Sequence, residues 1–165
     1  MKEQFIKLAK LNMWANERFR EVLRDLELND LQKETPYGVI LDLIIHIFEA
    51  LNMWLERMEK KPLVEKRKTS ADFYSVSEVM SAWKETDHLF LQVMKSFQDD
   101  EDFNRKIIYR RRGEETTYQV AIGDIIIHMS HHGFYHRGQL ALLLRHYGYK
   151  PAPPTDANKY FRREL

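Results

Sequence analysis

The sequence predicts an all-α fold, a bundle of four long antiparallel helices, in a single domain that spans residues 1–165. Three observations predict it. Apolar residues recur at steps of three and four over four long stretches, which is the period of an amphipathic helix. Capping residues, prolines and glycines bound several of these stretches. A chain of 165 residues with 44% hydrophobic content also suits one domain with one core.

The first helix is predicted from Lys2 to about Leu26, where apolar residues follow this period. The second is predicted from Val39 to Met58. Thr35-Pro36 precedes it and supplies an N-cap followed by proline at the first helical position. We expect this helix to end before Pro62. The charged segment from Lys60 to Ala71 lacks periodicity and is predicted to be a loop.

A third helix is predicted from Val76 to Phe97. Ser75 and Glu78 have the spacing of a capping box, in which each side chain binds the other residue's backbone amide. An acidic connection follows from Asp99 to Asp102. This helix should therefore begin sharply and end in a polar loop.

A short hairpin is predicted before the last long helix, in the crossover that leads to it. Its strands are Lys106–Tyr109 and Thr116–Tyr118, with the turn at Arg112-Gly113. An isolated hairpin is marginally stable, so this one must lie against the helices.

The fourth helix is predicted from Val120 to Tyr147 and ends at Gly148. Apolar residues occupy much of its circumference, which indicates either a central position or a dimer interface. The tail that follows is rich in proline, and Asp156 to Arg163 could form a terminal helical turn or two. This helix is therefore expected to be buried on more than one side.

Charge and composition exclude several classes of function. The net charge is +1, and the basic runs at Lys66–Lys68 and Arg110–Arg112 are short and flanked by acids, so no nucleic-acid partner is expected. No apolar stretch approaches the roughly 18 residues of a membrane span, and no signal-peptide core opens the chain. We therefore expect a cytoplasmic protein without a membrane partner. Because the chain has no cysteine, any thiol chemistry requires a thiol co-substrate.

Histidines are the strongest chemical signal. His132 and His136 lie about 40° apart around a helix, one turn above the other, so both imidazoles can reach one ion. His46 interrupts an apolar run in the second helix. If the two helices are neighbours, three imidazoles can hold a divalent cation and leave positions open for water or substrate. The alternative is that these residues are surface histidines or core histidines bonded to the backbone.

The chain resembles the DinB family. Residues 132–140 follow its HGxxHRGQ pattern, and the similarity extends to Asn12–Asn16, His46 and Tyr147-Gly148. The resemblance implies a four-helix bundle in an up-down-down-up arrangement with a long crossover. It also implies a three-histidine metal site, often with zinc or nickel, and frequent homodimers.

Carried over residue by residue, the resemblance places the metal ligands at His46, His132 and His136. His128 stands one turn before His132 and could replace a ligand, bond to one or be merely structural. Gln139 faces the same stripe and could orient water or a ligand. Asp42 could hold an imidazole or have a solvated or capping role. Gly138 is interpreted as a site of close helix packing, and the remaining histidines, His88, His131 and His146, as ordinary surface or core residues.

The family resemblance implies a metal-dependent S-transferase that joins a low-molecular-weight thiol, such as bacillithiol, mycothiol or glutathione, to a small electrophile. A metal-dependent hydrolase is the alternative within the enzyme class, and it would want a carboxylate base such as Asp42 or Glu49. A noncatalytic, stress-induced metal-binding protein is the alternative outside that class.

Overall fold

The computed structural model describes residues 1–36, 38–61, 66–111, 113–149 and 153–162. Four long helices dominate it, and short helices and one hairpin occupy the connections. The long helices are α1 (Lys2–Leu23), α3 (Ile40–Met58), α4 (Val76–Ser96) and α6 (Ile122–His146). The connections and the tail contain α2 (Leu28–Leu31), the 3₁₀ helix η1 (Ser70–Asp72), α5 (Asp100–Asn104), β1 (Lys106–Arg110), β2 (Thr117–Ala121) and α7 (Ala157–Phe161).

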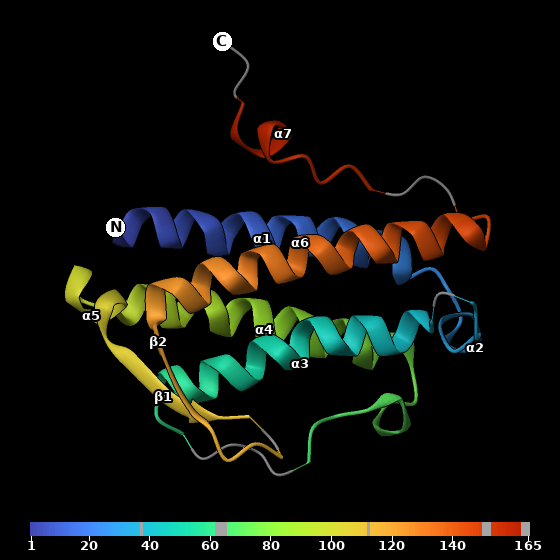
Figure 1. The fold of residues 1–165 in the computed structure, drawn as a ribbon. Helices are drawn as coiled ribbons and strands as arrows, with labels where there is room; N and C mark the ends of the chain where they lie inside the picture. The colour runs from blue at the N-terminus through green and yellow to red at the C-terminus, as the bar shows by residue number, and fades with distance from the viewer. Residues whose placement is uncertain (37, 62–65, 112, 150–152, 163–165) are drawn as a thin grey trace.

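The four long helices form an up-down-down-up bundle. In Figure 1, α1 and α6 run in one direction while α3 and α4 run in the other. Helix α1 packs against α4 and α6, and α3 also packs against both of these helices. Because α3 and α4 are parallel, the chain between them must return along the length of the bundle. The predicted fold class is thereby confirmed.

The interior has two apolar clusters with a polar layer between them. Phe19, Ile44 and Trp83 belong to the cluster at one end of the bundle. Leu55 and Phe90 belong to the cluster at the other end. Toward the middle of the helices, buried polar side chains and the three histidines of the predicted site lie between these clusters or beside their inner ends. They are Asn12, Asn16, Arg20, His46, Thr86, Asp87, His132, His136 and Arg137.

The structure tests the caps predicted for the second and third long helices. The prediction of an N-cap at Thr35 and a first helical residue at Pro36 is wrong: Val39 is the N-cap of α3. Thr35 and Gly38 instead exchange backbone hydrogen bonds of 3.2 and 3.1 Å in a turn, which ends before the helix begins. The cap at Ser75 is confirmed, since its Oγ accepts from the amide of Glu78 at 3.2 Å.

Only one of the two hydrogen bonds of the predicted capping box is present, the one from the Glu78 amide to Ser75. The carboxylate of Glu78 accepts from the amide of Tyr74 at 2.8 Å rather than from that of Ser75. The predicted first helix also ends earlier, at Leu23, and α2 follows it. Local side-chain choices therefore shifted boundaries without changing the order of the long helices.

The hairpin is confirmed as an antiparallel pair in which Ile107 lies opposite Val120. Because Val120 and Ala121 pair with β1, the last long helix begins at Ile122 rather than at Val120. Gly113 adopts a φ of +81°, which glycine tolerates best. The predicted features at Pro62 and Arg112, and the first proline of the tail, lie outside the described residues.

The connections contain more helix than predicted. The acidic segment expected as a loop forms α5, with Asp99 as its N-cap, and the charged loop after α3 contains η1. None of the helices in the described ranges is both long and apolar enough to cross a membrane.

Candidate metal centre

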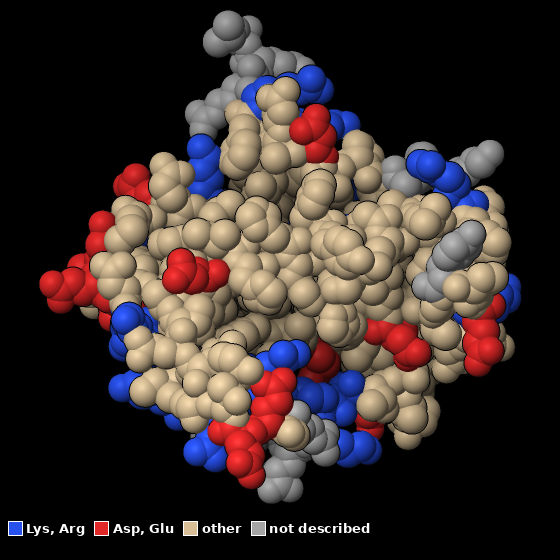
Figure 2. Space-filling view, viewed as in Figure 1, with Lys and Arg blue, Asp and Glu red and all other residues tan. Residues whose placement is uncertain are grey.

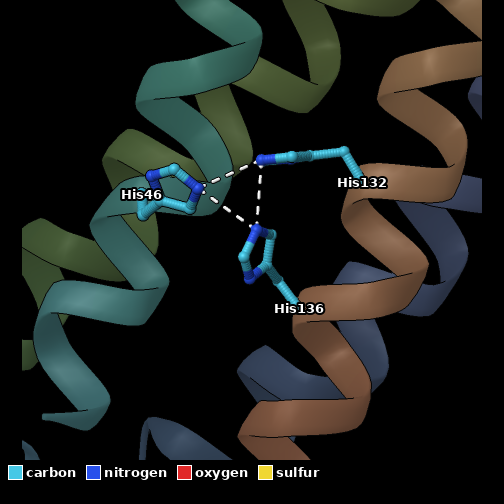
Figure 3. Close-up of side chains that lie close together, drawn as sticks. All are labelled: His46, His132 and His136. Carbon is cyan, nitrogen blue, oxygen red and sulfur yellow. Dashed lines mark hydrogen bonds between the residues drawn. The ribbon is translucent and has the colours of Figure 1, made fainter. Parts of the chain in front are cut away.

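Three imidazoles from two adjacent helices meet at one point. His46 comes from the middle of α3, and His132 and His136 lie one turn apart on α6 (Figure 3). The Nε2 atom of His46 lies 3.0 Å from that of His132 and 3.1 Å from that of His136. The Nε2 atoms of His132 and His136 are 3.1 Å apart. The three residues that the sequence singled out are therefore brought together.

Hydrogen bonding among the histidines cannot explain this triangle. A neutral imidazole has one N–H and one lone pair, each in the ring plane, so three Nε2 atoms cannot all bond to one another. Gln139 Oε1 lies 2.6 Å from Nδ1 of His136, and an oxygen acceptor there requires the proton on Nδ1. The Nε2 lone pair of His136 is then free and directed toward the other two rings. A cation at the centre removes the repulsion between such lone pairs.

The donor set fits a divalent metal. Zinc binds imidazole nitrogen at about 2.0–2.1 Å, so a tetrahedral zinc holds its ligand nitrogens roughly 3.3 Å apart. The three observed separations, 3.0 to 3.1 Å, are close to that value. Among the described histidine, cysteine, aspartate and glutamate residues, these three form a group whose ligand atoms lie close enough together to hold one metal ion. Three neutral ligands leave further coordination positions open.

The surroundings favour the neutral form of two of the three rings, His132 and His46. Burial lowers the pKa of His132 to about 4, with a smaller contribution from the neighbouring rings of His136, His46 and His128. Burial also lowers the pKa of His46, and His136 adds to that effect. Because only a neutral imidazole can bind a metal, both shifts reduce competition from protons.

Gln139 supports the site, while two other predicted helpers do not contact it. The amide of Gln139 holds His136, as described above. Asp42 is exposed, and in the described part of the chain no hydrogen bond or ion pair joins it to the histidines. Glu49 lies 3.8 Å from a guanidinium nitrogen of Arg67 and accepts from Asn52, so it serves another contact.

His128 lies beside the metal centre without belonging to it. Its ring centroid is 5.9 Å from that of His132, and its side chain is exposed. It lines a pocket of about 960 Å³ that His46 and His132 also line. The centre therefore opens on a cavity large enough for a small-molecule substrate. His88, His131 and His146 are exposed and lie outside the cluster of three, in agreement with the prediction.

A second polar cluster, which sequence reasoning missed, lies on the side of α6 that faces α1. Asp87 accepts from Asn16 at 2.7 Å and from Arg20 at 2.5 Å. Arg137 donates to Asn16 at 2.8 Å and to Asn12 at 3.1 Å. We call these five residues the buried network. Asparagines four residues apart in the apolar stripe of α1 were the available signal.

Burial dominates the electrostatics of this network. It raises the pKa of Asp87 to about 6, against the opposing effect of the Arg20 guanidinium and the Asn16 amide. It also lowers the pKa of Arg137 to about 10. Hydrogen bonds hold both charged groups in place, as expected for polar groups that are almost fully buried.

The glycines of the predicted signature have different roles from those expected. The interpretation of Gly138 as a site of close packing is wrong within the chain, because a Cβ built there would meet nothing within 4 Å. Gly133 is instead the glycine of this signature with close neighbours. A Cβ at Gly133 would lie 2.9 Å from an Arg137 guanidinium nitrogen and 3.3 Å from Asn12 Oδ1. Gly133 therefore leaves room for the buried network.

The fold and the site together define a four-helix-bundle protein with a candidate three-histidine metal centre. The family profile described as DinB family matches residues 1–164. The chain belongs to the DinB family, as the resemblance in its sequence implied.

Comparisons with individual proteins agree with this assignment. The chain is 25% identical to Protein DinB of Bacillus subtilis (strain 168) over 166 residues, which cover 97% of this chain and 95% of that protein. A DinB-like protein from Bacillus cereus ATCC 10987 has a similar fold, with a TM-score of 0.68 and 19% identity over 92% of this chain and 95% of that one. YfiT from Bacillus subtilis, described as a probable metal-dependent hydrolase with an unusual four-helix bundle topology, matches with a TM-score of 0.70 and 14% identity over 91% of both chains.

Proposed function

We propose that this protein is a metal-dependent S-transferase that joins a low-molecular-weight thiol to a small electrophile. The observation that carries the proposal is the convergence of three Nε2 atoms, 3.0 to 3.1 Å apart, at the wall of a large pocket. A divalent cation bound there would act as a Lewis acid and lower the pKa of a thiol that reaches it. Since the chain has no cysteine, the thiol comes from a small molecule of the bacillithiol, mycothiol or glutathione type.

The residues around the pocket favour a thiol over water as the nucleophile. A hydrolase was expected to need a carboxylate base, but Asp42 and Glu49 do not line the pocket and no other described carboxylate does. A free thiol has a pKa near 8.5, whereas that of water is 15.7, so a thiol needs far less help to lose its proton. His128 lines the pocket and is placed to take up that proton. Gln139 orients His136, and Met129 and Trp54 cover part of the pocket with apolar surface.

The reaction balances without a further reactant. With a chlorinated dinitrobenzene as the electrophile, the sulfur forms a bond to the ring carbon, the C–Cl bond breaks and chloride leaves. The thiol proton passes to His128 and then to solvent. No oxidant or reductant is needed.

The test is turnover of 1-chloro-2,4-dinitrobenzene with bacillithiol, mycothiol and glutathione, followed by absorbance. We expect a thiol-dependent rate that disappears in His132→Ala with helicity retained. The matched control is His131→Ala, which removes the neighbouring exposed histidine from outside the cluster and should leave the rate unchanged. If no thiol gives a rate above that of His132→Ala, the protein is better explained as a noncatalytic, stress-induced metal-binding protein.

A metal-dependent hydrolase is the second candidate, because the structural neighbour YfiT is described as a probable metal-dependent hydrolase. A rate on 4-nitrophenyl esters that needs no thiol and that disappears in His132→Ala would favour this candidate over the transferase.

We propose zinc or nickel as the metal, because imidazole nitrogen suits both ions. Elemental analysis of protein purified without a histidine tag should find about one of them per chain. His46→Ala should abolish that content, whereas Asp42→Ala should leave it unchanged because Asp42 lies outside the group of three.

We also propose that the protein forms a homodimer through α6. Ile127, Phe134 and Leu142 repeat at helical spacing on this helix and are 43%, 66% and 50% exposed. The surface over α6 carries few charged side chains in the view of Figure 2. Analytical ultracentrifugation should give a dimer for the wild type and a monomer for Phe134→Glu, and a monomeric wild type would contradict this proposal.

A further inference from the structure

The pocket beside the metal centre is strongly basic. Four arginines line it: Arg57 from α3, Arg67 from the loop after α3, and Arg110 and Arg111 from the hairpin. No carboxylate in the described ranges lines it. In the view of Figure 2, lysine and arginine side chains gather, with acidic ones among them, along the lower part of the molecule below α3.

The four guanidinium groups differ in how their charge is balanced. Arg67 lies 2.5 Å from Glu56, and Arg111 lies 3.2 Å from Glu114. Arg110 donates to the hydroxyl of Thr117, at 3.2 Å. Among the described residues, neither Arg110 nor Arg57 has a carboxylate within ion-pair distance. The positive charges of Arg110 and Arg57 therefore have no carboxylate within ion-pair distance in the described ranges.

Arg57 is held in place although it has no acidic partner. Its guanidinium carbon lies 4.6 Å from the ring centre of Trp54 and 5.0 Å from that of Tyr109, and these two rings contact each other edge to face. Its Nε atom is buried and has no hydrogen-bond partner in the described structure. A buried, unpaired donor is unfavourable, so contacts with the two rings rather than a hydrogen bond from Nε hold this guanidinium at the wall of the pocket. Burial, with a contribution from Arg67, lowers the pKa of Arg57 against the opposing effects of Tyr109 and Glu56.

The basic end of the pocket is continuous with the metal centre. His46, Ala50, Trp54 and Arg57 follow one another at steps of four and three on α3, so they share one face of the helix. All four line the same cavity. Arg57 lies eleven positions after His46 on α3, so their backbones are about 16 Å apart along the helix axis. A ligand that reaches both ends must therefore carry its anionic group several bonds away from its reacting atom.

We propose that this pocket selects a reactant that carries a carboxylate or phosphate group, bound by Arg57 and Arg110, with its middle part against Trp54 and its reacting atom at the three histidines. Guanidinium groups bind such oxyanions through paired N–H donors, and the aromatic wall suits a planar or apolar segment. This inference rests on the proposed function for the nature of the reaction, but the binding of the anion does not depend on the metal.

The first test is therefore a binding measurement without metal. Naphthalene-2-carboxylate and 2-naphthyl phosphate are titrated into protein held in a chelator, with neutral naphthalene-2-carboxamide as the matched ligand, by calorimetry. Both anions should bind at least tenfold more tightly than the carboxamide. The same preference should persist in His132→Ala, which removes one nitrogen of the metal centre.

Variants then locate the anion. Arg57→Gln and Arg110→Gln should each weaken anion binding about tenfold without affecting the carboxamide, and Arg57→Lys should be intermediate because it keeps the charge but loses the paired donors. Arg145→Gln, at an exposed arginine in the last turn of α6, is the control and should change nothing. Far-UV circular dichroism and zinc affinity should match the wild type in all four. Equal binding of the anion and the carboxamide, or an unchanged dissociation constant in Arg57→Gln, would overturn the proposal.

Kinetics decide which reactant carries the anion. If the electrophile does, 4-chloro-3,5-dinitrobenzoate should have a lower KM than its methyl ester, and Arg57→Gln should remove the difference. If the thiol does, Arg57→Gln should raise the KM for the thiol with both electrophiles. Anion binding without turnover would leave the pocket standing and reject the transferase, whereas turnover with no effect of Arg57→Gln on either KM would reject the pocket alone.

Discussion

Helix α6 presents polar groups to two sides, and the two sides differ in how these groups are satisfied. His132 and His136 face α3, where their nitrogens meet that of His46, and none of the described carboxylates lines the pocket beside them. Gly133 and Arg137, each one residue further on, face α1, where Arg137 bonds to Asn12 and Asn16. The same two turns of α6 thus supply two polar sites. We call the side with His132 and His136, which faces α3, the open side, and the side with Gly133 and Arg137, which faces α1, the closed side.

The difference teaches how to separate structural from functional polar residues. In the buried network, most donors meet acceptors and Arg20 is bonded to the carboxylate of Asp87, so the protein itself supplies the partners, with Arg137 Nε as the buried atom of the network that has none among the described residues. In the metal centre, three Nε2 atoms meet at 3.0 to 3.1 Å, an arrangement that hydrogen bonds among the rings cannot satisfy and that a cation can. A polar layer in a core therefore indicates a ligand where its groups are of one kind.

The largest expected effect on stability belongs to the closed side. Asp87→Ala removes the acceptor of Arg20 and Asn16 and should lower the free energy of unfolding by about 3–5 kcal/mol in urea denaturation of metal-free protein. Asp87→Asn keeps the shape and one acceptor oxygen and should lose less. His132→Ala should change the same quantity by less than about 1 kcal/mol, because its ring is partly exposed and makes no buried hydrogen bond. Similar losses for Asp87→Ala and His132→Ala would break the comparison.

The closed side should also depend on pH, with a sign that follows from Asp87. Its pKa is about 6 in the folded protein and 3.8 in the reference state, so between these values the folded protein binds a proton that the unfolded chain does not. The contribution of this group to stability is full below pH 4 and should fall by up to roughly 3 kcal/mol as the pH rises through 6. The measurement is the stability difference between the wild type and Asp87→Asn at pH 4, 5, 6 and 7. A difference that is constant over this range would contradict the burial effect.

The open side should respond to its supporting residue in metal affinity rather than in stability. Gln139→Leu removes the acceptor that orients His136 and should weaken zinc binding about 10- to 100-fold in a chelator competition. Gln139→Glu retains an acceptor at this position and should bind at least as tightly as the wild type. Gln92→Leu, at an exposed glutamine on α4, provides the control. Equal affinity in Gln139→Leu and Gln92→Leu would remove Gln139 from the site.

The smallest effects are expected at the two glycines of α6, and they should have opposite signs. Gly138→Ala adds a methyl group where nothing lies within 4 Å and should stabilise the monomer by about 0.5–1 kcal/mol through helix propensity. Gly133→Ala places its methyl group 2.9 Å from the Arg137 guanidinium and should destabilise the protein. Thermal unfolding of both variants at low protein concentration tests the pair. A destabilising Gly138→Ala would indicate instead that a second copy packs closely on this face.

Sequence reasoning predicted much of the fold because helices are encoded locally. The three-and-four spacing of apolar residues in α1, α3, α4 and α6 reflects contacts between neighbouring turns, and it identified all four. The spacing of His132 and His136 likewise sets their geometry before any packing is known. The boundaries were less accurate, since the start of α3 after Val39 depends on a turn at Gly38 that competes with a cap at Thr35.

Only the tertiary structure decided which helices are neighbours, and with it what the polar residues do. His46 lies 86 residues from His132, and Asn16 lies 121 residues from Arg137, so the same polar patterns are compatible with several packings. The burial of each polar group and the balance of its charge depend on many contacts with residues far away in the sequence. By itself, therefore, the sequence determined the helices and a two-histidine clip on one of them. The packing of α6 between α1 and α3 determined that Arg137 meets the asparagines of α1 and that His132 and His136 meet His46.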